Sequence, residues 1–227
     1  MNDICLFLET SVFLGYAFPD DRWELAAKAC LAALQKKYTS QTVENECSKK
    51  MDYSIRMIQQ ELLGFLRELK SKRGSDIFDE NGRERLLDKT RELKIWPFLK
   101  SVVSDLDPTT TYIALDDRLR ELLHEFLVEV DDRRTFIRTR INNLDIESWL
   151  RVDDYGTVQK QLRAAIPNPD DVEILLDAHD LTCHYKLELA FVTGDWKDIK
   201  QHEAQITGST GIKRIMYLAE FDHHGAA

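Results

Sequence analysis

The sequence predicts an α/β fold in three layers, with a central parallel sheet between helices and a large helical insertion. Short apolar runs, typical of buried parallel strands, lie near both ends of the chain and alternate with segments of helical spacing. The middle third has little strand signal. We therefore predict a core formed by 1–70 and 166–227, with 71–165 as the insertion. A chain of 227 residues that is 43% hydrophobic is long enough for one generous core.

The first part of the core is predicted to contain two strands and three helices. ICLFL at 4–8 is a continuous apolar run that predicts a buried strand, and KKYTS predicts a weaker strand ending at Ser40. Helices are predicted over 22–36, around 43–47 and over 53–70, the last with apolar residues at clean helical spacing.

The predicted insertion contains the most regular helix of the chain, over 116–130. It is followed by DDRRTFIRTR, which concentrates four arginines in one short span. These arginines could follow an RNA backbone, with Phe136 between them, or pair with acidic neighbours such as Asp131 on a solvated helix face. Both interpretations stay open. The four residues are Arg133, Arg134, Arg138 and Arg140.

The second part of the core returns to alternating helices and strands. DDVEILLDAHDLTCHYK follows Pro169 and predicts an amphipathic helix. A buried strand is predicted at 189–193, a helix from Asp195, a strand at 213–217 and a short helix at the end. Strands that alternate with helices imply a parallel sheet.

The composition narrows the function classes. The net charge of −9 does not favour polyanion binding by the whole surface, so a nucleic acid would need local basic patches or bound cations. The four cysteines are scattered without a CxxC pair, which argues against a zinc site and a disulfide framework and favours a reducing cytoplasm. The apolar N-terminal stretch lacks a basic start, and no run is long enough to predict a membrane span.

Four carboxylates stand at comparable places, near the ends of predicted strands or in the helices around them: Glu9, Glu46, Asp171 and Asp195. Three of them have a local explanation as well. Asp195 suits a helix N-cap with Asp198 one turn on, Asp171 suits a first helical turn, and Glu46 suits a solvated helix face. Glu9 is different, because a charge between two apolar runs is costly to bury without compensation. The alternative for the set is a cation site beyond the carboxyl ends of the strands.

Four segments in order carry a family resemblance. FLETSVFLGYAF, TSQTVENEC, DDVEILLDAHDL and FVTGDWKDI together resemble a PIN domain, the nuclease fold that includes VapC-type toxins. That family has a first strand ending in an Asp-Thr-Ser-like triplet and a later strand closing in Thr-x-Asp. The resemblance covers about 1–65 and 168–222 and leaves the insertion unexplained.

The resemblance implies a metal-dependent ribonuclease. Its catalytic acids fall on Glu9, Glu46, Asp171 and Asp195, and the metal ligands on Glu9, Asp171 and Asp195, with Asp198 as an extra ligand. The supporting hydroxyls are Thr10, Ser11 and Thr193, while Asp177 ranks below Asp171 because six residues do not return to one helix face. Hard Mg²⁺ or Mn²⁺ prefers such carboxylate oxygens, activates water and stabilises charge on a phosphodiester. Converging carboxylates should also raise one another's pKa values when no metal is bound.

The resemblance also implies partners and a setting. RNA is the substrate, and the expected setting is a cytoplasmic toxin with an antitoxin protein as partner, often as a homodimer. A housekeeping RNA-processing nuclease is the other setting that the insertion allows. We expect the insertion to form a helical cap beside the active-site groove.

Two departures leave alternatives open. The family's first acid is usually Asp, and the extra methylene of Glu9 shifts its carboxylate by about one C–C bond, although catalytic geometry tolerates little displacement. A weakened scaffold that binds RNA or protein without cutting is therefore the first alternative. A helical interaction protein built around 71–165 is the second.

Overall fold

The computed structural model describes residues 4–70, 77–93 and 95–224. These residues form two compact units. The sheet unit comprises 4–17, 22–49 and 134–224, and the helical unit comprises 18–21 and 50–133. The sheet unit is thus assembled from three separate stretches of the chain.

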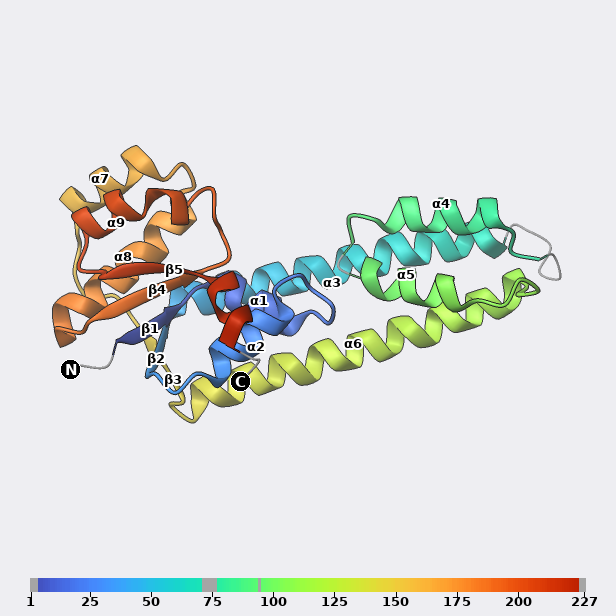
Figure 1. Ribbon diagram of the computed structural model, residues 1–227, viewed down its shortest axis with the longest axis horizontal. Coiled ribbons are helices and arrows are strands. Elements are labelled where there is room, and N and C mark those ends of the chain that lie inside the picture. The colour runs from blue at the N-terminus through green and yellow to red at the C-terminus, as the bar shows by residue number, and fades with distance from the viewer. Residues whose placement is uncertain (1–3, 71–76, 94, 225–227) are drawn as a thin grey trace. The chain divides into compact units, whose positions relative to one another are not determined.

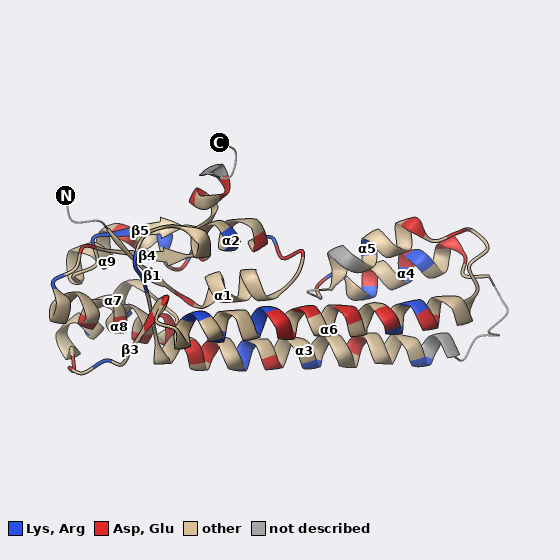
Figure 2. Cartoon of the chain, turned by 90° about the horizontal axis from the view of Figure 1, so that it is seen from below, with Lys and Arg blue, Asp and Glu red and all other residues tan. Residues whose placement is uncertain are grey.

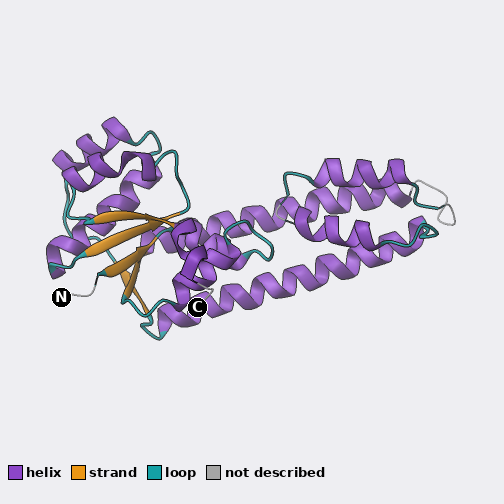
Figure 3. Ribbon diagram, in the orientation of Figure 1, coloured by secondary structure: helices purple, strands orange, loops and turns teal. Residues whose placement is uncertain are grey.

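The sheet unit is built on five parallel strands among its described residues: β1 (Cys5–Leu8), β2 (Lys37–Ser40), β3 (Ile146–Trp149), β4 (Leu189–Thr193) and β5 (Arg214–Tyr217). Their order across the sheet is β3-β2-β1-β4-β5, as labelled in Figure 1, and Figure 3 draws the strands in orange. The register pairs Leu8 with Val192 and Thr193 with Tyr217, so these strands end together at one edge. The predicted α/β fold with a parallel sheet is confirmed.

Helices begin at this carboxyl edge because each one returns the chain toward the next parallel strand. α1 (Thr10–Ala17) follows β1 and packs on α2 (Glu24–Ala32), and α3 (Gln41–Lys70) follows β2 directly. α8 (Pro169–Tyr185) packs on β2 and β4. α7 (Gly156–Ala165) packs on α8 and on α9 (Glu203–Ser209), and the three lie together beside the sheet (Figure 1). The first turns of α1, α3 and α8 therefore meet near the ends of β1 and β4.

Short 3-10 helices complete the sheet unit. η1 (Lys200–His202) leads into α9, and η2 (Leu218–His224) follows β5 and packs on α2. The core between these elements is apolar and closely packed, with the rings of Phe7 and Phe191 stacked at 5.5 Å between their centroids.

The helical unit contains α4 (Glu80–Thr90), α5 (Trp96–Asp105) and the greater part of α3 and of α6 (Tyr112–Asn142). It has its own core, in which Leu62, Leu66 and Leu119 are fully buried and the rings of Phe18 and Phe126 lie 6.4 Å apart. Basic and acidic side chains are interspersed along α3 and α6 (Figure 2). No helix of the described residues has the length and apolar composition needed to cross a bilayer.

Three sequence predictions need correction. The predicted helical insertion contains the strand β3, and the compact helical unit ends at residue 133, before it. The two helices predicted at 43–47 and 53–70 are one continuous helix, α3, and no helix begins at Asp195. Strand β3 was missed because it is an edge strand in which only Ile146 is buried, so it lacks the apolar run of a central strand.

Candidate metal centre

Glu9 lies at the point where β1 ends and α1 begins. Its side chain is only 8% exposed. The Ser11 N–H donates to Glu9 Oε2 at 3.0 Å, the Gly194 N–H donates to Oε1 at 3.1 Å, and the Ser11 hydroxyl also donates to Oε1. Burial raises the pKa of Glu9 above its ordinary value, although these hydrogen bonds act in the opposite direction. The Glu9 carboxylate therefore ties the start of α1 to the end of β4.

Gly194 makes this tie possible because the two chain segments approach closely. A Cβ atom at residue 194 would lie 2.8 Å from Ser11 Oγ and 3.0 Å from Trp23 Nε1. The Gly194 N–H also donates to Ser11 Oγ at 2.6 Å. Only glycine fits here without displacing Ser11 or Trp23.

Glu46 reaches the same place from the second turn of α3. The Thr10 hydroxyl, in the first turn of α1, donates to Glu46 Oε2. Glu46 is half-buried, and its contact with Thr10 places it beside the residue that follows Glu9. The hydroxyls predicted to support the site thus have two functions, with Ser11 holding Glu9 and Thr10 holding Glu46.

Asp171 joins the group from the first turn of α8. That helix is capped by Asn168, whose side chain accepts from the Asp170 N–H at 3.1 Å, and Pro169 suits its first position. The pKa of Asp171 is raised to about 7, chiefly by burial and next by the charge of Glu9. The charges of Glu46 and Asp195 raise it further, against a hydrogen bond from Asn168. The mutual effect expected of converging carboxylates is present at this residue.

The sequence left two roles open for Asp195, a backbone cap and a member of the acidic cluster, and Asp195 combines both. Its Oδ1 accepts from the Asp198 N–H at 2.8 Å, and its own N–H donates to Thr193 Oγ1 at 2.9 Å. It therefore caps the turn after β4, while its charge acts on Asp171. Asp198 is held through its backbone N–H, and η1 follows this turn in place of the predicted helix.

Asp177 lies deeper along α8 than Asp171 and faces other partners. It is 2% exposed, and burial raises its pKa against hydrogen bonds with Thr42 and Ser40. Its Oδ1 lies 3.5 Å from Arg151 Nε. Asp177 thus joins α8 to the β2–α3 junction and to Arg151.

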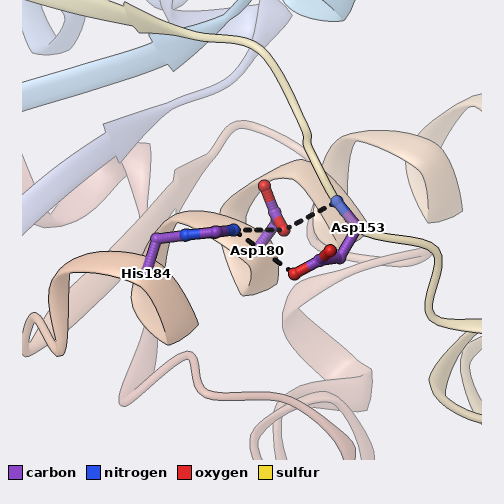
Figure 4. Close-up of side chains that lie close together, drawn as sticks. All are labelled: Asp153, Asp180 and His184. Atoms are coloured by element: carbon purple, nitrogen blue, oxygen red, sulfur yellow. Dashed lines mark hydrogen bonds and ion pairs between the residues drawn. The ribbon is translucent and has the colours of Figure 1, made fainter.

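A second acidic group, which the sequence analysis missed, lies at the other end of α8 (Figure 4). One ligand atom from each of Asp153, Asp180 and His184 lies within 4.8 Å of the others. The Asp180 carboxylate accepts from Trp149 Nε1 at 2.8 Å, Val152 N at 2.9 Å, Tyr155 Oη at 2.8 Å and Asp153 N at 3.3 Å. Its oxygens are therefore already occupied by protein donors.

The hydrogen bonds to Asp180 decide its charge state. Burial alone would raise the pKa of Asp180, but the hydrogen bonds from Val152, Trp149 and Tyr155 outweigh burial and hold that pKa below its ordinary value. Asp180 is thus an ionised anchor that fixes the segment after β3 to α8. The signal in the sequence was a pair of acids, Asp177 and Asp180, three apart in the middle of α8, where most of the residues are buried.

The four predicted RNA-binding arginines lie in the last turns of α6. Arg133 pairs with Glu129 at 2.5 Å, and Arg134 donates to Ser48 Oγ at 2.8 Å. The Arg140 guanidinium lies 3.2 Å from Asp145 and donates to the Leu31 carbonyl at 3.3 Å. Arg138 is exposed. Three of the four therefore have protein partners, and an RNA contact for any of them stays a prediction.

Comparisons with models of protein families, with characterised proteins and with solved structures found no match. The case for a function therefore rests on the residues and their arrangement.

Proposed function

We propose that this chain is a divalent-metal-dependent endoribonuclease that hydrolyses RNA phosphodiester bonds at the Glu9–Glu46–Asp171–Asp195 cluster. One observation carries the proposal. Four carboxylates from distant parts of the sequence converge beyond the carboxyl ends of β1 and β4, close enough for the charges of three to raise the pKa of the fourth. Such convergence costs stability unless a cation is bound, because like charges repel and burial removes their hydration.

The residue types suit a hard divalent cation, but among the described residues no three of these acids have ligand atoms within 4.8 Å of one another, so their side chains would have to close around the ion. Carboxylate oxygens are the ligands that Mg²⁺ and Mn²⁺ prefer. Glu9, Asp171 and Asp195 would hold the ion, with Asp198 as an extra ligand and Glu46 as a further catalytic acid. When bound, the ion lowers the pKa of water and stabilises negative charge on the phosphate during hydrolysis. Thr10, Ser11 and Thr193 position the acids through their hydroxyl groups.

The fold supports a PIN-like interpretation. The strand at the centre of the sheet, β1, leads into the first acid, as the family resemblance requires. Crossovers between parallel strands are right-handed as a rule, so connections that run in opposite directions across the sheet lie on opposite faces. The β1–β2 and β3–β4 connections run in opposite directions, which favours three layers with helices on both faces.

Cleavage of RNA by matched variants tests the proposal. Asp171→Asn and Asp195→Asn should each reduce Mn²⁺-dependent cleavage of a mixed RNA pool by about a hundredfold, the usual cost of one lost electrostatic contact to the reacting group. Asp170→Asn is the matched control, because Asp170 lies in the same helical turn but is exposed. Equal loss in Asp170→Asn, or cleavage that survives in chelator, would contradict the proposal.

A weakened scaffold that binds RNA or protein without cutting is the second candidate. It is favoured by the Glu9 carboxylate, which is buried and already accepts hydrogen bonds from Ser11 and Gly194. Such a carboxylate is a poorer metal ligand than one that faces solvent. Glu9→Asp discriminates the two: a large gain in cleavage supports a weakened site, and little change supports a site adapted to glutamate.

The setting belongs to the same proposal. The substrate is RNA, and a toxin with an antitoxin partner is the first setting, in the cytoplasm and as a homodimer. An RNA-processing nuclease is the other setting. Both use the same acidic cluster, so the cleavage experiment applies equally to each.

A further inference from the structure

Three aromatic side chains form a connected row at the carboxyl edge of the sheet. The ring centroids of Trp196 and Tyr217 lie 5.1 Å apart, and those of Tyr217 and Trp23 lie 5.2 Å apart, both with edge-on geometry. The Arg22 guanidinium lies 5.0 Å from the Trp23 ring centroid. Edge-on packing fixes each ring against the next while leaving ring faces for other contacts. We call these three side chains the aromatic row.

The aromatic row begins at the acidic cluster. Trp196 is the residue after Asp195, and Tyr217 ends β5 beside Thr193 of β4. At the other end, Trp23 Nε1 lies 3.0 Å from the place where a Cβ of residue 194 would be, next to the N–H that binds Glu9. A nucleotide whose phosphate is held by a cation at the acids would therefore have aromatic rings within reach of its base.

These residues are exposed enough to contact a ligand and are not part of the hydrophobic core. Trp196 is 49% exposed, and Tyr217 and Trp23 are only partly buried. Lys197 and Arg22 are exposed at the two ends of the row. Aromatic faces next to cations suit unpaired bases and the backbone phosphates that accompany them.

We propose that the aromatic row is a stacking platform for an unpaired base of single-stranded RNA, with Trp196 as its principal contact. The proposal rests on the proposed nuclease function and adds its substrate class. A duplex keeps its bases stacked inside, so it cannot offer them to Trp196. The platform therefore selects single-stranded segments, and the position of the base beside the acids presents the neighbouring phosphate for hydrolysis.

Binding of a non-hydrolysable single strand tests this directly. The probe is a labelled, phosphorothioate-linked RNA strand, measured by fluorescence anisotropy in Mn²⁺ beside the same sequence as a duplex. Trp196→Ala should weaken binding of the single strand by about tenfold, which is typical of one lost base-stacking contact. Trp196→Phe should stay within about threefold of the wild type because it keeps a ring. The wild type should bind the single strand more tightly than the duplex.

Tyr185→Ala is the matched control. Tyr185 is 51% exposed and packs edge-on against Trp149 at 5.2 Å, so it resembles Trp196 in exposure and contact, but it lies at the far end of α8 from Asp171. This variant should bind the single strand like the wild type. Wild-type affinity in Trp196→Ala, equal loss in Tyr185→Ala, equal binding of the duplex, or no binding by the wild type would each overturn the platform.

A parallel Mn²⁺ titration separates failure of the platform from failure of the nuclease. Trp196→Ala should bind Mn²⁺ like the wild type, because it removes no carboxylate. If Mn²⁺ binding is normal and only the strand experiment fails, the platform is wrong and the nuclease stands. If no protein binds Mn²⁺ but Trp196→Ala alone loses the single strand, the platform stands and the nuclease is wrong.

Discussion

The pKa of Asp171 depends strongly on its burial and on the acids that surround it. It is half-buried, and its pKa of about 7 lies well above the ordinary value because burial and three nearby acids disfavour its charge. Near neutral pH this carboxyl group is therefore only partly ionised when no metal is present. A bound cation would favour the ionised form, so metal binding should release a proton.

The stability of the metal-free protein should depend on pH through Asp171. The folded state keeps the proton up to about pH 7 and the unfolded state only to about pH 4, so this group's favourable contribution is lost as pH rises through 7. At pH 8 the ionised group costs about 2 kcal/mol, allowing for its partial exposure. Asp171→Asn should therefore raise Tm in chelator at pH 8 by about 4–8 °C and change it little at pH 4.

Thermal unfolding at the two pH values measures this effect. Asp170→Asn, in the same helical turn, should show no such difference between them. An equal shift in Tm at both pH values for Asp171→Asn would show that ionisation of Asp171 does not lower the stability of the folded state.

Gly194 shows how a residue without a side chain can determine a site. Gly194→Ala should cost about 1–3 kcal/mol, because its Cβ would press on Ser11 and Trp23. Ser11 must then turn away from Glu9, so Mn²⁺ affinity should fall as well. Gly208→Ala is the control, since a Cβ there meets no atom within 4 Å and the helix α9 should gain slightly from alanine. Chemical denaturation of both variants measures the costs, and equal stability would show that the close approach is unimportant.

The candidate acids could be predicted from the sequence, but their connections could not. Glu9 is conspicuous because it interrupts an apolar run, and Asp195 because it follows a buried strand. The bonds from Ser11 and Gly194 to Glu9 join residues of sequence separation up to 185, and only the assembled sheet brings them together. The spacing of residues in the sequence indicates which of them lie on the same helix or strand. It does not indicate which residues from different elements are in contact in the folded protein.

At the scale of elements, α8 connects two acidic groups with different functions. Asp171 in its first turn joins the candidate metal centre, and Asp180 near its end holds the last residue of β3 by one hydrogen bond and the segment after β3 by three. The edge strand β3 is itself little buried, so this anchor adds to the ladder with β2 in holding the strand. The same lack of burial explains why the sequence did not predict it.

Asp180→Asn should therefore destabilise the protein without affecting metal binding. The NH₂ group of the asparagine would face the N–H donors of Val152 and Trp149, so hydrogen bonds would be lost. This should lower the free energy of unfolding by about 3 kcal/mol. Asp153→Asn, at an exposed neighbour, should change stability by less than about 0.5 kcal/mol. Urea unfolding measures both, and a small cost for Asp180→Asn would show that the hydrogen bonds are replaceable.

The long helices could be foreseen only in part. Apolar spacing predicted helices at 53–70 and 116–130, yet α3 begins at Gln41 and α6 extends to Asn142. In the sheet unit, the end of α6 contacts other helices through Phe136 on Tyr16 of α1, Arg134 on Ser48 of α3 and Arg140 on Leu31 of α2, so the apolar stripe of the helical unit no longer applies there. Periodicity locates the middle of a helix better than its ends.

At the scale of the whole molecule, the candidate site belongs to one unit. Glu9, Glu46, Asp171 and Asp195 all lie in the sheet unit, although the helical unit separates Glu46 from Asp171 in the chain. The sequence predicted an insertion at this place because the strands stop and helical spacing continues. The candidate metal centre thus depends on chain segments that only the sheet unit brings together.

A calorimetric Mn²⁺ titration of the wild type, Asp195→Asn and Asp180→Asn at pH 8 would show whether the acidic cluster binds a metal ion. Asp195→Asn removes a carboxylate from the candidate metal centre, and Asp180→Asn removes one from the group in Figure 4. We expect binding by the wild type, loss of binding in Asp195→Asn, and normal binding in Asp180→Asn. Binding that survives in Asp195→Asn and disappears in Asp180→Asn would place the metal at the Asp153, Asp180 and His184 group. No binding by the wild type would contradict a metal centre at the Glu9–Glu46–Asp171–Asp195 cluster.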